Sequence, residues 1–481
     1  MLSLDLADRG MLSRSEYLYR TIRDAIVAGK LVPEEKLPSK RKLADELGCS
    51  LITVESALSQ LVAEGYIEAR PRRGCYVERL GKLPEATAQA LPKAEAKTLP
   101  EREQLRIDTS HLPARPDRSA LLLWERSLRH VLSAEDLDEA FSSLTPQGLP
   151  RLQQAIATHI AQTRGMRVEA DQIVVAAGAQ VLYQLVAQLL PAGSLCAVED
   201  PGFPRIARTY EAEGKRAVPV PLDAEGIAME GIRSKDVQLV HAMPSHQFPT
   251  GRVMSISRRY ELLGWAAEVP GRLIVEDDYD CEFRLAGRPI PALASIDATG
   301  AVIYIGTFSK SLGPVVRAAY AVLPPAAARR YEEFRSFAAG TLGTIDQLAL
   351  ATMLEDGSYE SHVARYRRLV KERRDHLAET LARELGESMK LEEADSGLHM
   401  VLALRLQPAW CGREREAEEA LVEAARKCGI GLAALSSYAQ LPYRGDGSAR
   451  FVLQYERLED GETEELAASL GTLARRTGVC G

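Results

Sequence analysis

The 481-residue chain lacks any apolar run near the roughly 20 residues that a membrane-spanning helix needs. Its first residues lack the basic and then apolar pattern of a secretory signal peptide. Cysteine is scarce, with seven residues and no Cys-x-x-Cys pair, which argues against a disulfide framework and a zinc site. The chain has no overall basic excess, because 60 Lys and Arg face 67 Asp and Glu. These absences predict a cytoplasmic protein with reduced thiols, no membrane partner and no metal.

What is present is ordinary for a folded protein: 46% hydrophobic and 26% charged residues. At roughly 100–200 residues per domain, the length predicts two or three domains. The charge is unevenly spread, however. Residues 13–77 hold eleven Lys and Arg against nine Asp and Glu, although the net charge of the chain is −7. A local basic excess on a small module is a weak sign of phosphate binding.

Apolar spacing near the N-terminus predicts three helices, at 17–28, 40–47 and 51–64. The short joint between the second and third helices is typical of a helix-turn-helix. A hairpin over 66–77 follows, with Arg72 and Arg73 at its tip. Residues 1–80 are therefore predicted to form a winged helix-turn-helix domain.

Residues 81–106 are rich in Ala, Pro, Glu and Lys without a sustained apolar period, which indicates a linker. In residues 107–481, short apolar runs alternate with helical stretches, a pattern typical of an α/β domain with a mostly parallel sheet. The expected strands lie at 173–177, 195–198, 238–240, 273–276 and 301–305. From about residue 336 the pattern favours a smaller α+β subdomain with strands at 398–404 and 450–455.

A polar loop containing Lys310 follows the expected strand 301–305. Loops beyond the carboxyl ends of strands are where α/β sheets build sites. A lysine there can form a Schiff base with pyridoxal phosphate, whose phosphate Thr307, Ser309 and Arg317 would bind. An ordinary surface lysine in a polar loop is the alternative, and this segment alone leaves it open.

Acidic residues follow the expected strand 273–276. A pyridoxal cofactor needs a carboxylate to keep its ring nitrogen protonated, and a phenol beside the ring hydroxyl helps further. Asp277 and Tyr279, on the same side of an extended chain, meet both needs. A solvated acidic loop or a divalent-metal site built from the same carboxylates stays open.

Three other segments give weaker signals. The turn at 178–180 could present backbone N–H groups to a phosphate, or could merely allow close strand–helix packing. His246 lies in a Pro-Ser-His-Gln-Phe-Pro-Thr-Gly segment that could line a cofactor, although a lone histidine is more often structural. Phe203 could stack on an aromatic ring or belong to the core.

The order and spacing of these segments resemble the fold-type I aminotransferases. The motifs that carry the resemblance are residues 178–180, 199–204, 244–251, 276–280 and 309–314, with Arg317. A GntR-type winged helix, marked by residues 37–41 and 64–67, precedes them. The chain thus resembles the MocR family of transcription regulators over nearly its whole length apart from the linker.

The resemblance implies pyridoxal 5′-phosphate as cofactor, with Lys310 as its Schiff-base lysine, Asp277 at the pyridine nitrogen and Tyr279 at the ring hydroxyl. The other implied cofactor-binding residues are Gly178, Ala179, Gln180, Phe203, His246, Thr307, Ser309 and Arg317. Arg205 and a C-terminal arginine would receive the carboxylate of an effector. We place the latter at Arg450, with Arg444 as the fallback.

The resemblance also implies promoter DNA as a partner and a head-to-tail homodimer, in which each winged helix rests on the partner's large domain. The residues expected to contact double-stranded DNA are Ser39, Lys40, Arg41, Ser50, Thr53, Glu55, Ser56, Arg72, Arg73 and Gly74.

The sequence departs from the family pattern at several positions. Phe203 stands where a tyrosine is usual, so stacking survives and a hydroxyl is lost. Ser143 replaces a tyrosine that reaches the partner subunit's phosphate in aminotransferases, which puts that contact in doubt. Leu51 and Ile52 replace a polar pair at the start of the recognition helix, so direct base readout should be weaker or shifted along the helix.

Three functions remain compatible with the sequence. The main hypothesis is a DNA-binding regulator that senses a small amine or amino acid, which forms an external aldimine in place of Lys310. The second is a working aminotransferase, because the residues for the first half of transamination are present. The third is a regulator for which pyridoxal phosphate itself is the signal.

Overall fold

The computed structural model describes residues 12–80, 105–110, 118–133, 145–286, 291–395, 397–443 and 445–480. The chain divides into two compact units, Met1–Arg102 and Glu103–Gly481. Ser143, Arg444 and most of the expected linker lie outside the described residues. The finer domain bounds at residues 80 and 106 stay a prediction.

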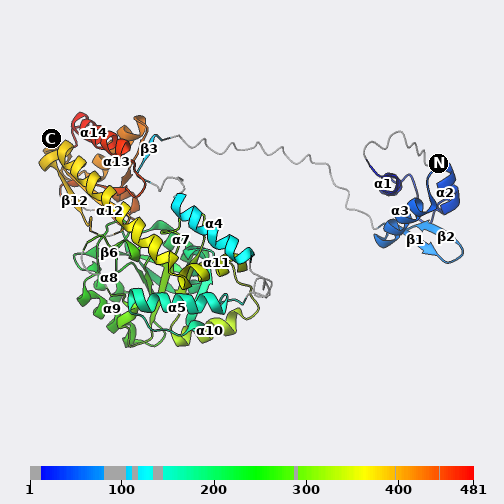
Figure 1. Cartoon of the computed structure of the whole chain (residues 1–481), viewed down its shortest axis with the longest axis horizontal. Helices are drawn as coiled ribbons and strands as arrows, with labels where there is room; N and C mark the ends of the chain where they lie inside the picture. Colours follow the sequence, from blue (N-terminus) through cyan, green and yellow to red (C-terminus); the bar gives the residue numbers. More distant parts are fainter. Residues whose placement is uncertain are drawn as a thin grey trace. The chain divides into compact units, whose positions relative to one another are not determined.

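Three helices and a hairpin make up the N-terminal unit (Figure 1). They are α1 (Arg14–Val27), α2 (Lys40–Leu47), α3 (Leu51–Ala63), β1 (Ile67–Arg70) and β2 (Gly74–Val77). Each helix begins at a serine whose hydroxyl accepts a hydrogen bond from a backbone N–H of the first turn: Ser13, Ser39 and Ser50. The inner faces of the three helices share one apolar core, which includes Leu18, Ile22, Leu43, Val54 and Leu61. The winged helix-turn-helix prediction is confirmed in its element order.

An eight-stranded sheet organises the second unit. In spatial order its strands are β4 (Ile173–Ala176), β11 (Ala319–Val322), β10 (Val302–Thr307), β9 (Leu273–Asp277), β8 (Val237–Ala242), β5 (Leu195–Asp200), β6 (Arg216–Asp223) and β7 (Gly226–Ile227). All run parallel except β11 and β7. The mostly parallel α/β prediction is therefore confirmed.

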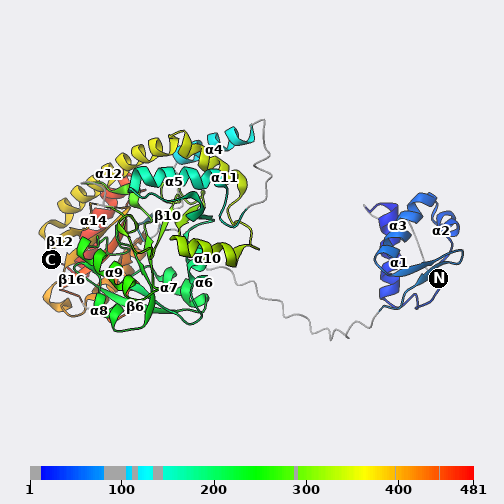
Figure 2. The same cartoon turned by 90° about the horizontal axis from the view of Figure 1, so that it is seen from below.

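Helices cover both faces of this sheet (Figure 2). The helices of the second unit are α4 (Arg118–Leu132), α5 (Pro150–Arg164), α6 (Ala179–Gln188), α7 (Pro204–Ala212), α8 (Met229–Arg233), α9 (Ile256–Glu268), α10 (Pro325–Arg335), α11 (Thr344–Glu355), α12 (Ser358–Leu385), α13 (Glu414–Lys427) and α14 (Asp460–Arg476). Val174 of β4 packs into a cluster with residues of α6 and α7, whereas its neighbour Val175 packs with residues of α5 and α11. Among the described residues, no helix combines the length and apolar character that a bilayer crossing requires.

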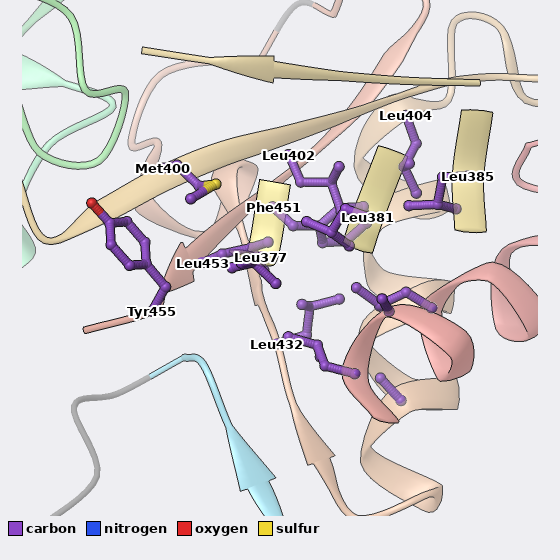
Figure 3. Close-up of a cluster of buried hydrophobic side chains, with 14 of the residues drawn as sticks. Leu377, Leu381, Leu385, Met400, Leu402, Leu404, Leu432, Phe451, Leu453 and Tyr455 are labelled. Atoms are coloured by element: carbon purple, nitrogen blue, oxygen red, sulfur yellow. The ribbon is translucent and has the colours of Figure 1, made fainter. Parts of the chain in front are cut away.

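A four-stranded sheet forms the C-terminal subdomain, in the order β12 (Met389–Glu392), β13 (His399–Arg405), β16 (Ser448–Gln454), β15 (Ala433–Ala434). The pairings are antiparallel. Leu377 and Leu381 of α12 pack with Leu402 and Phe451 of the sheet (Figure 3). A short parallel pair, β3 (Ile107–Asp108) with β14 (Ile430–Gly431), fixes the start of the unit to this subdomain.

The expected strands omit β11, which lies between β4 and β10. Its four residues, Ala-Tyr-Ala-Val, follow a polar loop, and so short a run carries no decisive periodicity. Its alanines nevertheless suit a strand that is buried on both faces.

Two leucines of α12 provide a matched test of the subdomain core. Leu381→Ala should lower the free energy of unfolding by about 2–5 kcal/mol, because this fully buried side chain would leave a cavity. Leu369→Ala, at a position 39% exposed, should change it by less than about 0.5 kcal/mol. Urea unfolding of the full chain measures both values, and equal losses would contradict the packing described.

Candidate functional site

A cavity of about 510 Å³ opens at the carboxyl ends of β4, β9 and β10. This volume falls in the usual range for small-molecule sites. The sequence-predicted residues that line it are Gly178, Ala179, Gln180, Phe203, Arg205, Asp277, Tyr279, Thr307, Ser309, Lys310 and Arg317. Segments that lie far apart in the chain thus meet at one place, because parallel strands present their carboxyl ends at the same edge.

Asp277 ends β9 with its carboxylate 2% exposed. The Tyr183 hydroxyl donates a hydrogen bond to Oδ2 at 2.5 Å, and His241 Nε2 lies 3.4 Å from the same oxygen. Burial and the Asp277 carboxylate raise the pKa of Tyr183 well above its usual value, so the phenol stays a donor. The other oxygen, Oδ1, is buried without a hydrogen-bond partner. Asp277 therefore offers one unused acceptor beside the cavity.

Lys310 lies three residues beyond β10, with its Nζ 5.6 Å from the centre of the Tyr279 ring. The lysine is half-buried and lines the cavity. Its loop is held by Ser309, whose hydroxyl donates to the Val316 carbonyl at 2.8 Å. The structure thus places the lysine and the unused Asp277 oxygen at the same cavity.

The start of α6 and Arg317 form an anion cradle. Gly178 caps α6 with φ 100°, and a Cβ there would lie 3.0 Å from Arg317 Nη2. The guanidinium therefore lies directly against the first residues of a ten-residue helix, whose free N–H groups favour anions. Thr307 and Ser309 line the cavity on the neighbouring loop.

The structure does not bring His246 to the cavity wall. Its ring is 3% exposed, and Nδ1 lies 2.8 Å from Asp280 Oδ2 and 3.2 Å from the Tyr279 hydroxyl. His246 therefore contacts Tyr279, which lines the cavity, and does not itself line it.

The structure also keeps Arg450 away from the cavity. Its Nε and Nη2 lie 2.9 and 2.7 Å from Glu392 and Asp446 oxygens. The Arg450 guanidinium, which was expected to bind the carboxylate of an effector, is therefore paired with Glu392 and Asp446. Arg205 does line the cavity, is exposed, and lies 5.4 Å from the Phe203 ring centre.

Sequence reasoning missed several cavity residues, among them Tyr183, His399, Glu456 and Arg457. Tyr183 lies on α6, four residues after Ala179, a spacing that could have signalled it. Glu456 and Arg457 follow β16, on the C-terminal subdomain, and only the packing of that subdomain against the large sheet brings them to the cavity.

The other carboxylates of the acidic segment are buried and engaged by separate groups. Asp278 pairs with Arg164 at 2.5 Å, and Glu276 accepts from the backbone N–H groups of Leu293 and Ala294. The segment is therefore no solvated loop. Its side chains diverge to different partners, which also weakens the alternative of a shared divalent ion.

On the winged-helix unit, nearly all the residues expected at DNA are exposed: Ser39, Lys40, Arg41, Ser50, Glu55, Ser56, Arg72, Arg73 and Gly74. Thr53 is half-buried. Lys40 and Glu55 form an ion pair at 2.5 Å between α2 and α3, and the Ser39 and Ser50 hydroxyls serve as helix caps. Arg41, Arg72 and Arg73 stand as exposed cations on α2 and at the hairpin tip.

Comparison with known proteins matches both units. Residues 14–77 match the bacterial regulatory proteins of the gntR family, and residues 120–439 match the class I and II aminotransferases. The fold of the second unit is similar to that of kynurenine aminotransferase from Pyrococcus horikoshii, with a TM-score of 0.66 and 23% identity over 78% of this chain and 92% of that one.

Among curated proteins, the chain is 34% identical to the uncharacterised HTH-type transcriptional regulator YdeL of Bacillus subtilis, over 89% of this chain and 90% of that one. It is 32% identical to the probable rhizopine catabolism regulatory protein MocR of Rhizobium meliloti, over 80% of each chain. It is also 32% identical to the pyridoxine biosynthesis transcriptional regulator PdxR of Corynebacterium glutamicum, over 80% of this chain and 82% of that one.

The two matched domains define a transcription regulator in which a GntR-type DNA-binding domain is joined to an aminotransferase-like domain of fold type I. Its class of effector domain implies pyridoxal phosphate as the cofactor. The chain belongs to the MocR family of these regulators.

The cavity fits the implied cofactor on its own geometry. The unpartnered Asp277 Oδ1 suits a protonated ring nitrogen, and the α6–Arg317 cradle suits a phosphate. Lys310 supplies an amine at the same cavity.

A buried carboxyl behind this site makes stability depend on pH. Burial raises the pKa of Glu199, at the end of β5, from 4.5 to about 8. The folded protein therefore holds a proton that the unfolded chain releases, so this stabilisation is complete below about pH 4.5 and is lost as the pH rises through about 8. The unfolding free energy of the unsubstituted protein should fall more between about pH 5 and pH 8 than that of Glu199→Gln, which stays neutral. Urea unfolding at several pH values measures the difference; parallel curves would contradict the prediction.

Proposed function

We propose that the protein is a pyridoxal phosphate-dependent transcription regulator that binds promoter DNA through its winged helix and senses the cofactor or a small amine or amino acid at Lys310. The observation that carries the proposal is the presence, in one chain, of an exposed basic winged helix and a cavity where Lys310, Asp277 and the α6 anion cradle meet. The family resemblance supports a cytoplasmic head-to-tail homodimer as the working form.

Each group at the cavity has a definite task. When bound, pyridoxal phosphate supplies an aldehyde that condenses with primary amines. Asp277, held by Tyr183, stabilises the positive charge of a ring nitrogen. Tyr279, backed by His246, offers a hydroxyl at the cavity wall, while Arg317 and the start of α6 bind phosphate oxygens. With pyridoxal phosphate bound, Lys310 would hold its aldehyde, and an incoming amine would have to displace the lysine, so the site would respond to amines.

The DNA-binding part rests on the charge distribution of the N-terminal unit. Arg41, Arg72 and Arg73 would contact phosphates, while exposed residues of α3 face the bases. Ser39, Ser50 and Glu55 act mainly on the protein side, as caps and as the partner of Lys40. Occupancy of the cavity would change the affinity for DNA by favouring one arrangement of the full chain.

A working aminotransferase is the second candidate, because the same cavity is lined by Lys310, Asp277 and Tyr279, which the first half of transamination would use. A measurement of transamination turnover distinguishes the regulator from the aminotransferase. A regulator gives a stable spectral change with one amine, whereas an enzyme accumulates a keto product with a second substrate.

Replacing Lys310 tests the proposal that the cavity binds pyridoxal phosphate through this lysine. Lys310→Ala should lose the visible absorption band that protein-linked pyridoxal phosphate gives, because no other described lysine lines the cavity. Lys371→Ala, on the exposed side of α12, should retain the band. An unchanged band in Lys310→Ala would refute the assignment.

Substitutions at the hairpin tip test whether the winged helix binds DNA phosphates. Arg72→Ala and Arg73→Ala should each weaken binding to double-stranded DNA about threefold to tenfold and reduce the slope of log affinity against log salt by about one. Arg20→Ala on α1, where Arg20 pairs with Glu16, is the control and should bind as the unsubstituted protein does. Binding measured by fluorescence anisotropy at several salt concentrations checks this; unchanged slopes would exclude phosphate contacts at the hairpin.

A further inference from the structure

The start of α3 exposes two large apolar side chains. Leu51 and Ile52, the first two residues of the helix, are 45% and 78% exposed. The neighbouring hydroxyl groups are engaged within the protein, because Ser50 Oγ accepts from the Thr53 N–H and lies 2.8 Å from Thr53 Oγ1. The outer surface of this first helical turn is therefore apolar.

The rest of α3 offers few polar groups for base recognition. The helix contains no Lys, Arg, Asn or His, although Arg and Lys are the usual readers of guanine in the major groove and Asn a usual reader of adenine. Its single amide, Gln60, donates to Glu64 Oε1 at 3.0 Å. Ser56 and Ser59 are exposed, but a hydroxyl can bond to any base. The helix thus lacks the free side chains that usually read purines.

The elements next to α3 supply cations. Glu55, the one charged residue of α3, pairs with Lys40 at 2.5 Å and so brings the start of α2 against the second turn of α3. Arg41 follows Lys40 and is exposed, and Arg72 and Arg73 are exposed at the hairpin tip. These charges match a polyanion. The major groove of duplex DNA combines flanking phosphates with one apolar group on its base edges, the 5-methyl group of thymine.

We propose that Leu51 and Ile52 are specificity-determining residues, which contact the 5-methyl groups of thymines in the major groove. This inference rests on the DNA-binding part of the proposed function. In a helix-turn-helix the N-terminal residues of the second helix contact base edges, and these two residues occupy that position on α3. The chemistry of base readout at this position is therefore methyl contact in place of hydrogen bonding, and the preferred half-site contains thymine there.

A substitution in the DNA tests this contact directly. The full chain first selects its preferred sites from random duplex DNA, and each thymine of the selected half-site is then replaced by deoxyuridine. This change removes one methyl group and leaves base pairing unchanged. At one or two positions per half-site it should weaken binding about threefold to fivefold, the effect expected for one buried methyl group. Fluorescence anisotropy at constant salt measures the affinities.

Variants of α3 assign the methyl effect to residues. Ile52→Ala and Leu51→Ala should each lose the effect at one thymine, so that the thymine and deoxyuridine duplexes bind within about 1.5-fold of each other. Their affinity for the deoxyuridine duplex should match that of the unsubstituted protein, which a misfolded variant would not achieve. Val62→Ala, at an exposed apolar position near the other end of α3, is the control and should keep the full effect.

The outcomes separate this inference from the proposed function. A full chain that selects no site and binds no duplex overturns both. Binding that is insensitive to every deoxyuridine replacement overturns only the methyl contact, and so does a methyl effect that survives in both Ile52→Ala and Leu51→Ala. If either variant changes the oligomeric state in size-exclusion chromatography and leaves the DNA affinity unchanged, the apolar pair contacts protein instead, which also overturns the inference.

Discussion

The parallel alignment of β4, β9 and β10 is the constraint on which the site depends. Parallel neighbours must end at the same edge of a sheet, so the loops after three distant segments converge. β11 makes this possible, because its antiparallel run returns the chain from the lysine loop and separates β4 from β10 by one strand. In this strand order the loop after β10, which contains Lys310, lies between the start of α6 after β4 and Asp277 at the end of β9.

Glu276 to Asp280 are five acidic or phenolic residues next to this edge. Because side chains alternate between the two sides of an extended chain, successive residues of this run meet different partners. Asp277 and Tyr279 reach the cavity, whereas Asp278 is directed to Arg164 and Tyr304 and Glu276 to backbone N–H groups. Two oxygens of the run are buried without a hydrogen-bond partner, Asp277 Oδ1 and Asp278 Oδ1. Of these two residues, only Asp277 lines the cavity.

The sequence predicted the architecture and the core of the site because both rest on local patterns. Apolar periodicity located the helices of the winged helix, and short strand-ending motifs located Asp277, Lys310 and Gly178. Local patterns do not predict the positions of side chains that depend on tertiary contacts. His246 lies in a suggestive motif, yet packs behind Tyr279. Arg450 lies within β16, yet two neighbouring carboxylates hold its guanidinium. Arg457 reaches the cavity through a turn that carries no motif.

Gly397 allows the backbone of the C-terminal subdomain to approach His246 and Asp280 very closely. A Cβ at this residue, just before β13, would lie 1.9 Å from the His246 ring and 2.6 Å from Asp280 Oδ2. The backbone at Gly397 therefore packs directly against the imidazole, with no side chain between them. Because His246 Nδ1 also lies 3.2 Å from the Tyr279 hydroxyl, a single imidazole ring connects the start of the small sheet with the phenol at the cavity wall, and no residue with a side chain could replace Gly397 without displacing that ring.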